Sequence, residues 1–170
     1  MKVIVIGCTH SGTAAVKTIR KTYPYDNIDI TVYERNNNVS FLSCGIALYI
    51  GGVVQDEKGL FYSNAQELST LGINMLLEHE VLRINFDQKK IWVKNLQTNE
   101  EFSDYFDKLI LSTGSWPVIP KINGINSKNL FLCKNFDHAK EIIQYAKKVN
   151  NITIVGAGYI GVELAEAFSL

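Results

Sequence analysis

The chain has 170 residues, of which 46% are hydrophobic and 20% are charged, and its formal net charge is zero. This length allows one domain, or one domain and part of a second, and the apolar content is ample for a buried core. The balanced charge argues against a nucleic-acid or anionic-membrane partner, and no apolar run is long enough to span a membrane. Three widely spaced cysteines match neither a disulfide framework nor a zinc site, so the sequence predicts a protein of the reducing cytoplasm.

The N-terminal segment predicts a strand, a glycine turn and a helix. Lys2–Ile6 is a continuous apolar run, typical of a strand buried on both faces of a parallel sheet, and residues 13–22 have helical apolar spacing. Residues 7–12, GCTHSG, lie between them. The two outer glycines of this segment suit a tight turn and close helix–strand packing. The helix N-terminus would then face a pyrophosphate. Thr9 replaces the middle glycine of G-x-G-x-x-G, so this motif alone is a weak signal.

A second predicted strand, residues 28–34, supports nucleotide binding because it ends in an acid at about the right distance. Glu34 could accept hydrogen bonds from an adenosine ribose. A generic βαβ unit with an exposed glutamate is the alternative, and nucleotide binding is the favoured interpretation.

The segment 39–49, VSFLSCGIALY, places Cys44 just ahead of a short apolar run that predicts a helix start. A thiol at a helix N-terminus lies at the positive end of the backbone dipole, which favours the thiolate. Such a thiolate can attack, be oxidised or pass electrons to an adjacent cofactor. An inert buried thiol is the alternative.

The middle of the chain predicts a turn at Gly51 and Gly52, a helix over residues 64–71 capped by Asn64, and then short strands. Residues 73–102 predict a small antiparallel meander inserted into an α/β domain, with Trp92 in its core and strands at residues 74–77, 81–85 and 91–94. Residues 107–114 predict another buried strand, whose small C-terminal residues would allow a ligand to approach closely.

The C-terminal part predicts an amphipathic helix over residues 137–149 with an aspartate cap, and a buried strand at residues 151–155. That strand leads into a complete G-x-G-x-x-G, made by Gly156, Gly158 and Gly161, and a following helix. This signal is much stronger than the first one. Since the sequence stops inside the helix, we expect these residues to be a piece of a longer protein.

The remaining cysteine and histidine residues predict no further chemistry. Cys133 is expected in the core of a strand, Cys8 as a small residue of the first turn, and His79 and His138 as packing or surface residues without a metal.

With these features together, the sequence resembles the FAD-dependent pyridine nucleotide–disulfide oxidoreductase superfamily, and within it the single-cysteine NADH oxidase and NADH peroxidase group. The likeness covers the whole chain and is closest to the water-forming oxidases. Its most specific pieces are GCTHSG (7–12), SFLSCG (40–45), GLFYS (59–63) and GYIGVE (158–163). It implies an α/β fold in which residues 1–116 form a Rossmann-like, parallel-sheet FAD-binding domain with the meander. Residues 117–170 would begin a second Rossmann-like domain that binds NAD(P)H.

The resemblance also implies the binding residues. The glycine motifs at residues 7–12 and 156–161 would be the first and second nucleotide-binding fingerprints. FAD would contact the first fingerprint, the acid that binds the ribose, and residues at later strand ends, namely Gly7, Cys8, Thr9, His10, Ser11, Gly12, Glu34, Arg35, Cys44, Val81, Thr113, Gly114 and Ser115. NADH would bind at Gly156, Gly158, Tyr159, Ile160, Gly161 and Glu163. In such proteins the tyrosine at position 159 shields the flavin until the nicotinamide arrives.

The same likeness implies the chemistry. Disulfide reductases of the superfamily carry C-x4-C, but Tyr49 stands at the second position here, so Cys44 would cycle through sulfenic acid. NADH would reduce FAD, which delivers electrons to oxygen, forming water, or to peroxide. His10 matches a proposed acid/base, with phosphate-loop hydrogen bonding as an equal alternative.

Three competing functions remain open at this point. NADH peroxidase and coenzyme A-disulfide reductase also use one cysteine, and a nucleotide-binding redox sensor without turnover is the non-enzymatic alternative. The parent protein is expected to dimerise through a C-terminal domain, and the residues that select NADH or NADPH are expected after Leu170.

We also expect the 170-residue chain alone to bind FAD weakly or not at all and to lack catalysis. Mixing it with FAD and NADH tests this, because a stoichiometric yellow complex with NADH turnover would contradict it.

Overall fold

The computed structural model describes residues 1–23 and 27–169, and the chain divides into two compact units. The first unit comprises Met1–Ser40 and Tyr62–Gly114, and the second comprises Phe41–Phe61 and the residues from Ser115 onward. The predicted domains, residues 1–116 and 117–170, were defined by the nucleotide that each would bind, FAD and NAD(P)H. This assignment stays a prediction.

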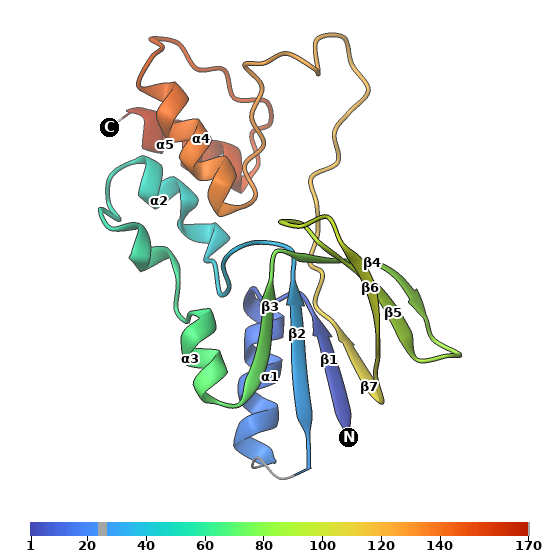
Figure 1. The fold of residues 1–170 in the computed structure, drawn as a ribbon. Helices are drawn as coiled ribbons and strands as arrows, with labels where there is room; N and C mark the ends of the chain where they lie inside the picture. Colours follow the sequence, from blue (N-terminus) through green and yellow to red (C-terminus); the bar gives the residue numbers. More distant parts are fainter. Residues whose placement is uncertain (24–26, 170) are drawn as a thin grey trace. The chain divides into compact units, whose positions relative to one another are not determined.

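A parallel sheet forms the centre of the first unit (Figure 1). Its strands lie in the order β3-β2-β1-β7 and have the bounds β1 Lys2–Ile6, β2 Asp29–Glu34, β3 Ile73–Leu77 and β7 Lys108–Leu111. The two central strands, β1 and β2, are almost entirely buried, as their continuous apolar runs predicted. The predicted α/β class with a parallel sheet is therefore confirmed.

Helices cover one face of this sheet. α1 (His10–Thr22) connects β1 to β2, and α3 (Ala65–Thr70) precedes β3. Their buried side chains, Val16 and Leu68, pack with Val3, Val5 and neighbouring apolar residues of the strands. Asn64 caps α3 as predicted, because its side chain accepts a hydrogen bond from the Glu67 N–H at 2.8 Å.

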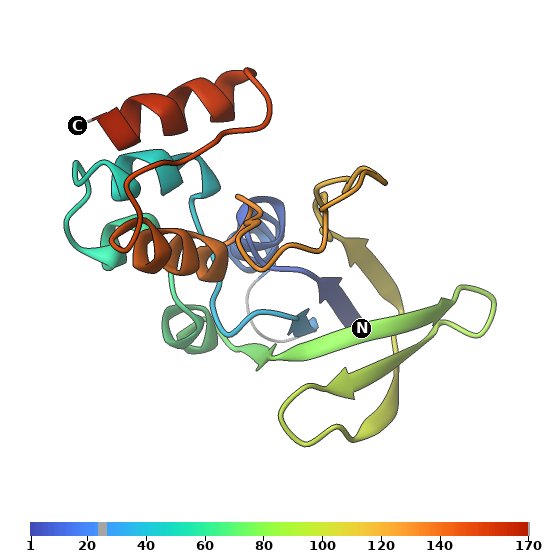
Figure 2. The ribbon, with the colours of Figure 1, turned by 90° about the horizontal axis from the view of Figure 1, so that it is seen from above.

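The antiparallel meander covers the other face, as the view from above shows (Figure 2). It consists of β4 (His79–Asn85), β5 (Lys90–Asn95) and β6 (Glu101–Tyr105). Ile91 and Val93 of β5 pack against Ile4 and Ile6 of β1. The meander layer is thus held by a shared apolar core.

A polar contact also joins the meander to the sheet. The Tyr33 hydroxyl of β2 donates to Asp104 Oδ2 at 2.8 Å, and the Lys2 Nζ of β1 donates to Asp104 Oδ1 at 2.6 Å. Burial and this bond raise the pKa of the Tyr33 phenol, which therefore stays a donor.

Three predictions for the first unit were wrong in detail. Ile73–Leu77 belongs to the parallel sheet and not to the meander, because its backbone pairs with β2, and the third meander strand is β6. β7 is an edge strand that is only partly buried. Trp92 lies on the outer face of β5, with the Arg83 guanidinium 3.6 Å from its ring centroid, since the alternation of the strand turns Ile91 and Val93 to the core.

The second unit is built from short helices. They are the 3-10 turns η1 (Ser43–Gly45) and η2 (Glu57–Leu60) and the α-helices α2 (Ile46–Ile50), α4 (Phe136–Ala146) and α5 (Tyr159–Ser169). Three aromatic rings, those of Phe41, Phe61 and Phe136, form its core with centroid distances of 5.1 to 5.8 Å. The predicted turn at Gly51 and Gly52 follows α2.

Three predictions for this unit were also wrong. Residues 151–155 are mostly exposed and form no strand, because the described residues offer them no neighbouring strand to pair with. α4 is capped by Asn135, whose side chain accepts from the His138 N–H, while Asp137 lies in the first turn and pairs with Lys140. Cys133 lies in a loop and is only half-buried.

Within the two described stretches of the chain, no helix combines the length and the apolar character that crossing a membrane requires.

The contact around Asp104 predicts a pH-dependent stability. Burial opposes ionisation of this carboxyl, but hydrogen bonds from Lys2, Tyr33 and the Tyr105 N–H outweigh burial and lower its pKa. A lowered folded-state pKa stabilises the fold above the ordinary aspartate value of about 3.9, and this stabilisation is lost as the pH falls through the folded-state pKa. Asp104→Asn should therefore cost about 1–2 kcal/mol at pH 7, with a smaller difference below about pH 4.

Urea unfolding of the two proteins between pH 7 and pH 2 measures this difference. Glu101→Gln, which removes an exposed carboxylate from the same strand, is the matched control and should leave the pH dependence unchanged. An Asp104→Asn effect of constant size across the range would contradict the explanation.

Candidate functional site

The first glycine turn brings the N-terminus of α1 against the end of β1. Gly7 has φ +88°, and a Cβ on it would lie 2.4 Å from the Ser112 carbonyl oxygen. A Cβ on Gly12 would lie only 2.0 Å from the Gly7 carbonyl oxygen. Neither position accepts a side chain, so both glycines are required by the packing. The first-turn amides of α1 then face the space beyond the carboxyl end of the sheet, where an anion would be stabilised.

Glu34 lies beside this turn, as predicted. The residue is 3% exposed, and its Oε2 accepts a hydrogen bond from the Cys8 N–H at 2.6 Å. Oε1 accepts from the backbone N–H and the side-chain amide of Asn36, at 2.8 and 2.6 Å. A carboxylate offers about four acceptor positions, so these three bonds leave about one for a ligand hydroxyl. The predicted ribose contact stays a prediction.

Cys8 is a packing residue of the turn. Its thiol is fully buried and lies 3.5 Å from the Thr13 hydroxyl. Burial raises the pKa of this thiol, the Thr13 hydrogen bond opposes the rise, and the Glu34 charge adds to it. A neutral, inaccessible thiol is chemically quiet, so the contribution of Cys8 is its amide bond to Glu34.

The other predicted FAD residues of the first unit lie near the same end of the sheet. Thr113 follows β7, and its backbone nitrogen is 3.4 Å from the position of a Cβ on Gly7, while Gly114 has φ +66°. Because β1 lies between β2 and β7, this is the switch point where open α/β sheets bind ligands. Arg35 follows β2 and pairs at 3.5 Å with Glu80, the neighbour of Val81 in β4.

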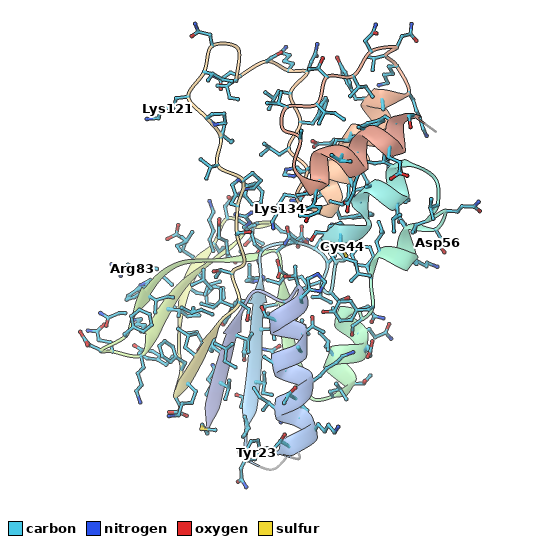
Figure 3. The ribbon with its side chains drawn as sticks, turned by 180° about the vertical axis from the view of Figure 1, so that it is seen from behind. Tyr23, Cys44, Asp56, Arg83, Lys121 and Lys134 are labelled. Atoms are coloured by element: carbon cyan, nitrogen blue, oxygen red, sulfur yellow. The ribbon has the colours of Figure 1, made fainter. Side chains whose placement is uncertain are left out.

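Cys44 lies in the second unit, in the 3-10 turn that precedes α2, where Figure 3 labels it. Its thiol is free and exposed. The turn is held by hydrogen bonds from the Leu42 N–H to the Leu60 carbonyl at 2.8 Å and from the Gly45 N–H to the Leu42 carbonyl at 2.9 Å. The predicted cysteine ahead of a helix is confirmed, although α2 has only five residues.

The glycine packing of the second fingerprint repeats that of the first. Gly156 has φ +109°, and a Cβ on Gly161 would lie 2.0 Å from the Gly156 carbonyl oxygen. The space around Gly158 is open, and the Tyr159 side chain is 91% exposed. A ligand can therefore approach this turn closely. Glu163 follows in α5 and is exposed.

Two other predicted residues of the second unit have neighbours within it. Ser115 is exposed, and its hydroxyl accepts a hydrogen bond from the Lys134 Nζ at 3.2 Å. Burial, together with the nearby Glu163 charge, raises the pKa of the Cys133 thiol. Cys133 therefore differs from the exposed Cys44 in being partly buried.

Two residues of the site were missed by the sequence reasoning. Asn36 completes the hydrogen bonds of Glu34, and the Tyr62 hydroxyl donates to the Thr9 carbonyl at 3.1 Å. Tyr62 follows Thr9 by 53 positions, and no spacing rule connects them. Its place in the GLFYS piece of the family resemblance was the one available signal.

The remaining histidines, His79 and His138, are expected from the sequence to be packing or surface residues without a metal. In the ranges that the structure describes, no group of three His, Cys, Asp or Glu side chains could hold a metal ion. Burial lowers the pKa of His138, whose ring packs edge-on against Trp116, and His79 Nδ1 lies 2.7 Å from the Leu77 carbonyl. Both are packing residues.

Comparisons with known proteins agree with these features. Residues 1–170 match the family described as pyridine nucleotide-disulphide oxidoreductase. An NADH oxidase of Enterococcus faecalis is 54% identical over 168 residues, which are 99% of this chain and 37% of that protein. A coenzyme A disulfide reductase of Staphylococcus aureus is 32% identical, over 97% of this chain and 37% of that protein.

A solved structure agrees as well. The water-forming NADH oxidase from Lactobacillus brevis, bound to NADH, has a TM-score of 0.95 and 53% identity, covering 99% of this chain and 37% of that one. The chain thus spans 37% of the length of each of these relatives.

The glycine packing predicts a contrast between two fingerprint positions. Gly12→Ala should lower the free energy of unfolding by about 1–3 kcal/mol or more, because the new Cβ overlaps the Gly7 carbonyl. Gly158→Ala should change it by less than about 0.5 kcal/mol, since open space surrounds that position. Urea unfolding of both variants provides the measurement, and equal destabilisation would show that the packing of Gly12 is not the cause.

Proposed function

Because the chain belongs to the pyridine nucleotide-disulphide oxidoreductase family, we propose that it is the N-terminal part of an FAD-dependent NADH oxidase that reduces oxygen to water. One observation carries the proposal: two glycine turns with the same 2.0 Å packing precede and follow one exposed cysteine in the sequence. Two nucleotides and one redox-active thiol are what such a reaction needs. The parent enzyme is proposed to be a homodimer.

The residues of the first unit fit an FAD molecule. Among the described residues no side chain caps the first turn of α1, so its amides suit the pyrophosphate, and Glu34 keeps an acceptor position for the ribose. The proposed set in this unit is Gly7, Cys8, Thr9, His10, Ser11, Gly12, Glu34, Arg35, Val81, Thr113 and Gly114. Cys8 acts through its bond to Glu34. When bound, the flavin accepts hydride from NADH and passes electrons on to the acceptor.

The residues of the second fingerprint fit NADH. The open surroundings of Gly158 allow a pyrophosphate to approach the backbone, and the exposed Tyr159 ring is free to move for the nicotinamide. The proposed set is Gly156, Gly158, Tyr159, Ile160, Gly161 and Glu163, with Ser115 and Cys44 as further cofactor contacts of the second unit.

Cys44 is the proposed redox centre. Its sulfur attacks one oxygen of a peroxide formed from molecular oxygen, so that a sulfur–oxygen bond forms, the O–O bond breaks and the leaving hydroxide takes a proton to become water. Two electrons supplied by a second NADH, together with two protons, then return the sulfenic acid to the thiol and release a second water. Tyr49 stands where a resolving cysteine would be in C-x4-C, so local disulfide formation does not compete.

His10 is the proposed proton donor for the leaving hydroxide. It is the first residue of α1, and its side chain is exposed. An imidazole can both give and take a proton, and it is therefore a common general acid.

A second function is favoured by the coenzyme A disulfide reductase relative, because a lone exposed cysteine also suits a mixed disulfide with a small thiol. NADH peroxidase is the third candidate of the same class. A redox sensor would show reactive Cys44 without repeated NADH consumption. Comparing oxygen, peroxide and coenzyme A disulfide as acceptors for the full-length protein separates these candidates.

The oxidase proposal predicts a change of product in Cys44→Ser. The wild-type full-length protein should transfer four electrons per oxygen and release no peroxide. The variant lacks the thiol that cleaves peroxide, so it should transfer two electrons per oxygen and release peroxide in proportion to NADH. NADH absorbance, oxygen uptake and peroxide are recorded together.

Cys133→Ser is the matched control and should keep the wild-type stoichiometry, because that thiol is partly buried in a loop. Water formation by Cys44→Ser would exclude the proposed role of Cys44. Absence of NADH turnover in the wild type would favour the sensor instead.

A further inference from the structure

Tyr62 is anchored next to the first fingerprint by the backbone around it. The Ser63 N–H donates to the Ser40 hydroxyl at 2.8 Å, and that hydroxyl donates to the Ser63 carbonyl at 2.5 Å. Ser40 is fully buried with φ 58°, and its own N–H donates to the Cys8 carbonyl at 2.9 Å. Because a non-glycine residue rarely adopts this conformation, the three bonds hold an otherwise unfavourable turn. These hydrogen bonds therefore fix the backbone from which the Tyr62 side chain projects.

The Tyr62 hydroxyl donates a hydrogen bond to the carbonyl of Thr9, which does not point along the axis of α1 as a helical carbonyl does. Thr9, the residue before α1, has ψ −116°, far from the helical value near −42°. Its carbonyl accepts from the Tyr62 hydroxyl at 3.1 Å, with the His10 carbonyl a second acceptor at 3.4 Å. At the matching position of the second fingerprint, the Gly158 carbonyl accepts an ordinary helical bond from the Val162 N–H at 3.0 Å.

The Tyr62 ring lies parallel to the imidazole of His10. Their ring centroids are 5.8 Å apart, and the planes meet at 12°. His10 is exposed, and Tyr62 is 44% exposed. An exposed histidine at the start of a helix would otherwise sample several side-chain rotamers, and the stacked ring favours one of them.

We propose that Tyr62 is a positioning residue for His10: its hydroxyl holds the Thr9 carbonyl and its ring holds the imidazole in the orientation used for proton transfer. This inference rests on the proposed function of His10. Reaction rates respond strongly to misplacement of a reacting group by about 1 Å. A side chain that removes this freedom acts on turnover and not on NADH binding.

The contact itself is tested without flavin, in the 170-residue chain carrying isotope-labelled histidine. The chain has three histidines, so single substitutions assign their NMR signals. A stacked aromatic ring shifts the signals of the ring beneath it, and Tyr62→Leu should abolish this shift for His10 alone. Tyr62→Phe keeps the ring and should retain it. An unchanged His10 signal in Tyr62→Leu would overturn the proposal.

The consequence is tested in the full-length protein. Tyr62→Leu should lower kcat about tenfold with the KM for NADH unchanged within about twofold, and Tyr62→Phe should recover most of the rate. In a His10→Ala background, Tyr62→Leu should cause no further loss, because it acts through His10. Tyr105→Leu, which removes an exposed tyrosine of the meander, is the control and should leave kcat unchanged.

The outcomes distinguish this inference from the proposed function. Suppose that the wild type is active and that Tyr62→Leu and His10→Ala lower kcat independently, so that their effects multiply. This result, or a change in the KM for NADH alone, overturns the positioning role of Tyr62 and leaves the oxidase proposal intact. Absence of NADH turnover in the wild type refutes the oxidase, and the NMR comparison then still decides whether Tyr62 orients His10. If Tyr62→Leu does not fold, Tyr62→Met replaces it, since its flexible side chain has a similar length.

Discussion

The contact of Gly12 with the carbonyl of Gly7 is the constraint on which the first unit depends. Helix α1 reaches the end of β1 only because both positions lack a side chain. This close approach places the first-turn amides beyond the carboxyl end of the sheet. Val16, further along the helix, packs against Val3 and Val5 of β1. One contact between two glycines thus serves both the apolar core and the anion-binding turn.

Polar side chains then stiffen this turn from two directions. The buried Glu34 carboxylate accepts the Cys8 N–H, so the residue that would meet a ribose also holds the glycine turn. Tyr62 donates to the Thr9 carbonyl on the other side. Both bonds join segments that are distant in the sequence, and such bonds order a binding loop before a ligand arrives, which reduces the entropy lost on binding.

The second fingerprint shows how far local geometry is independent of its surroundings. Gly156 and Gly161 reproduce the close contact of Gly7 and Gly12, although residues 151–155 form no strand in the described chain. The turn and the start of α5 require only local sterics, whereas a strand requires a hydrogen-bonded neighbour. The exposed Tyr159 and the open space at Gly158 keep this turn accessible.

The sequence by itself determined the features that depend on neighbouring residues: the central strands from their apolar runs, both glycine turns, the Asn64 cap and the position of Cys44 ahead of a helix. Only the tertiary structure decided that Ile73–Leu77 pairs with β2, that Trp92 faces outward, and that Tyr62 lies on His10. The physical reason is range. Periodicity and sterics act over a few residues, whereas strand pairing and side-chain stacking depend on which distant segments the fold brings together.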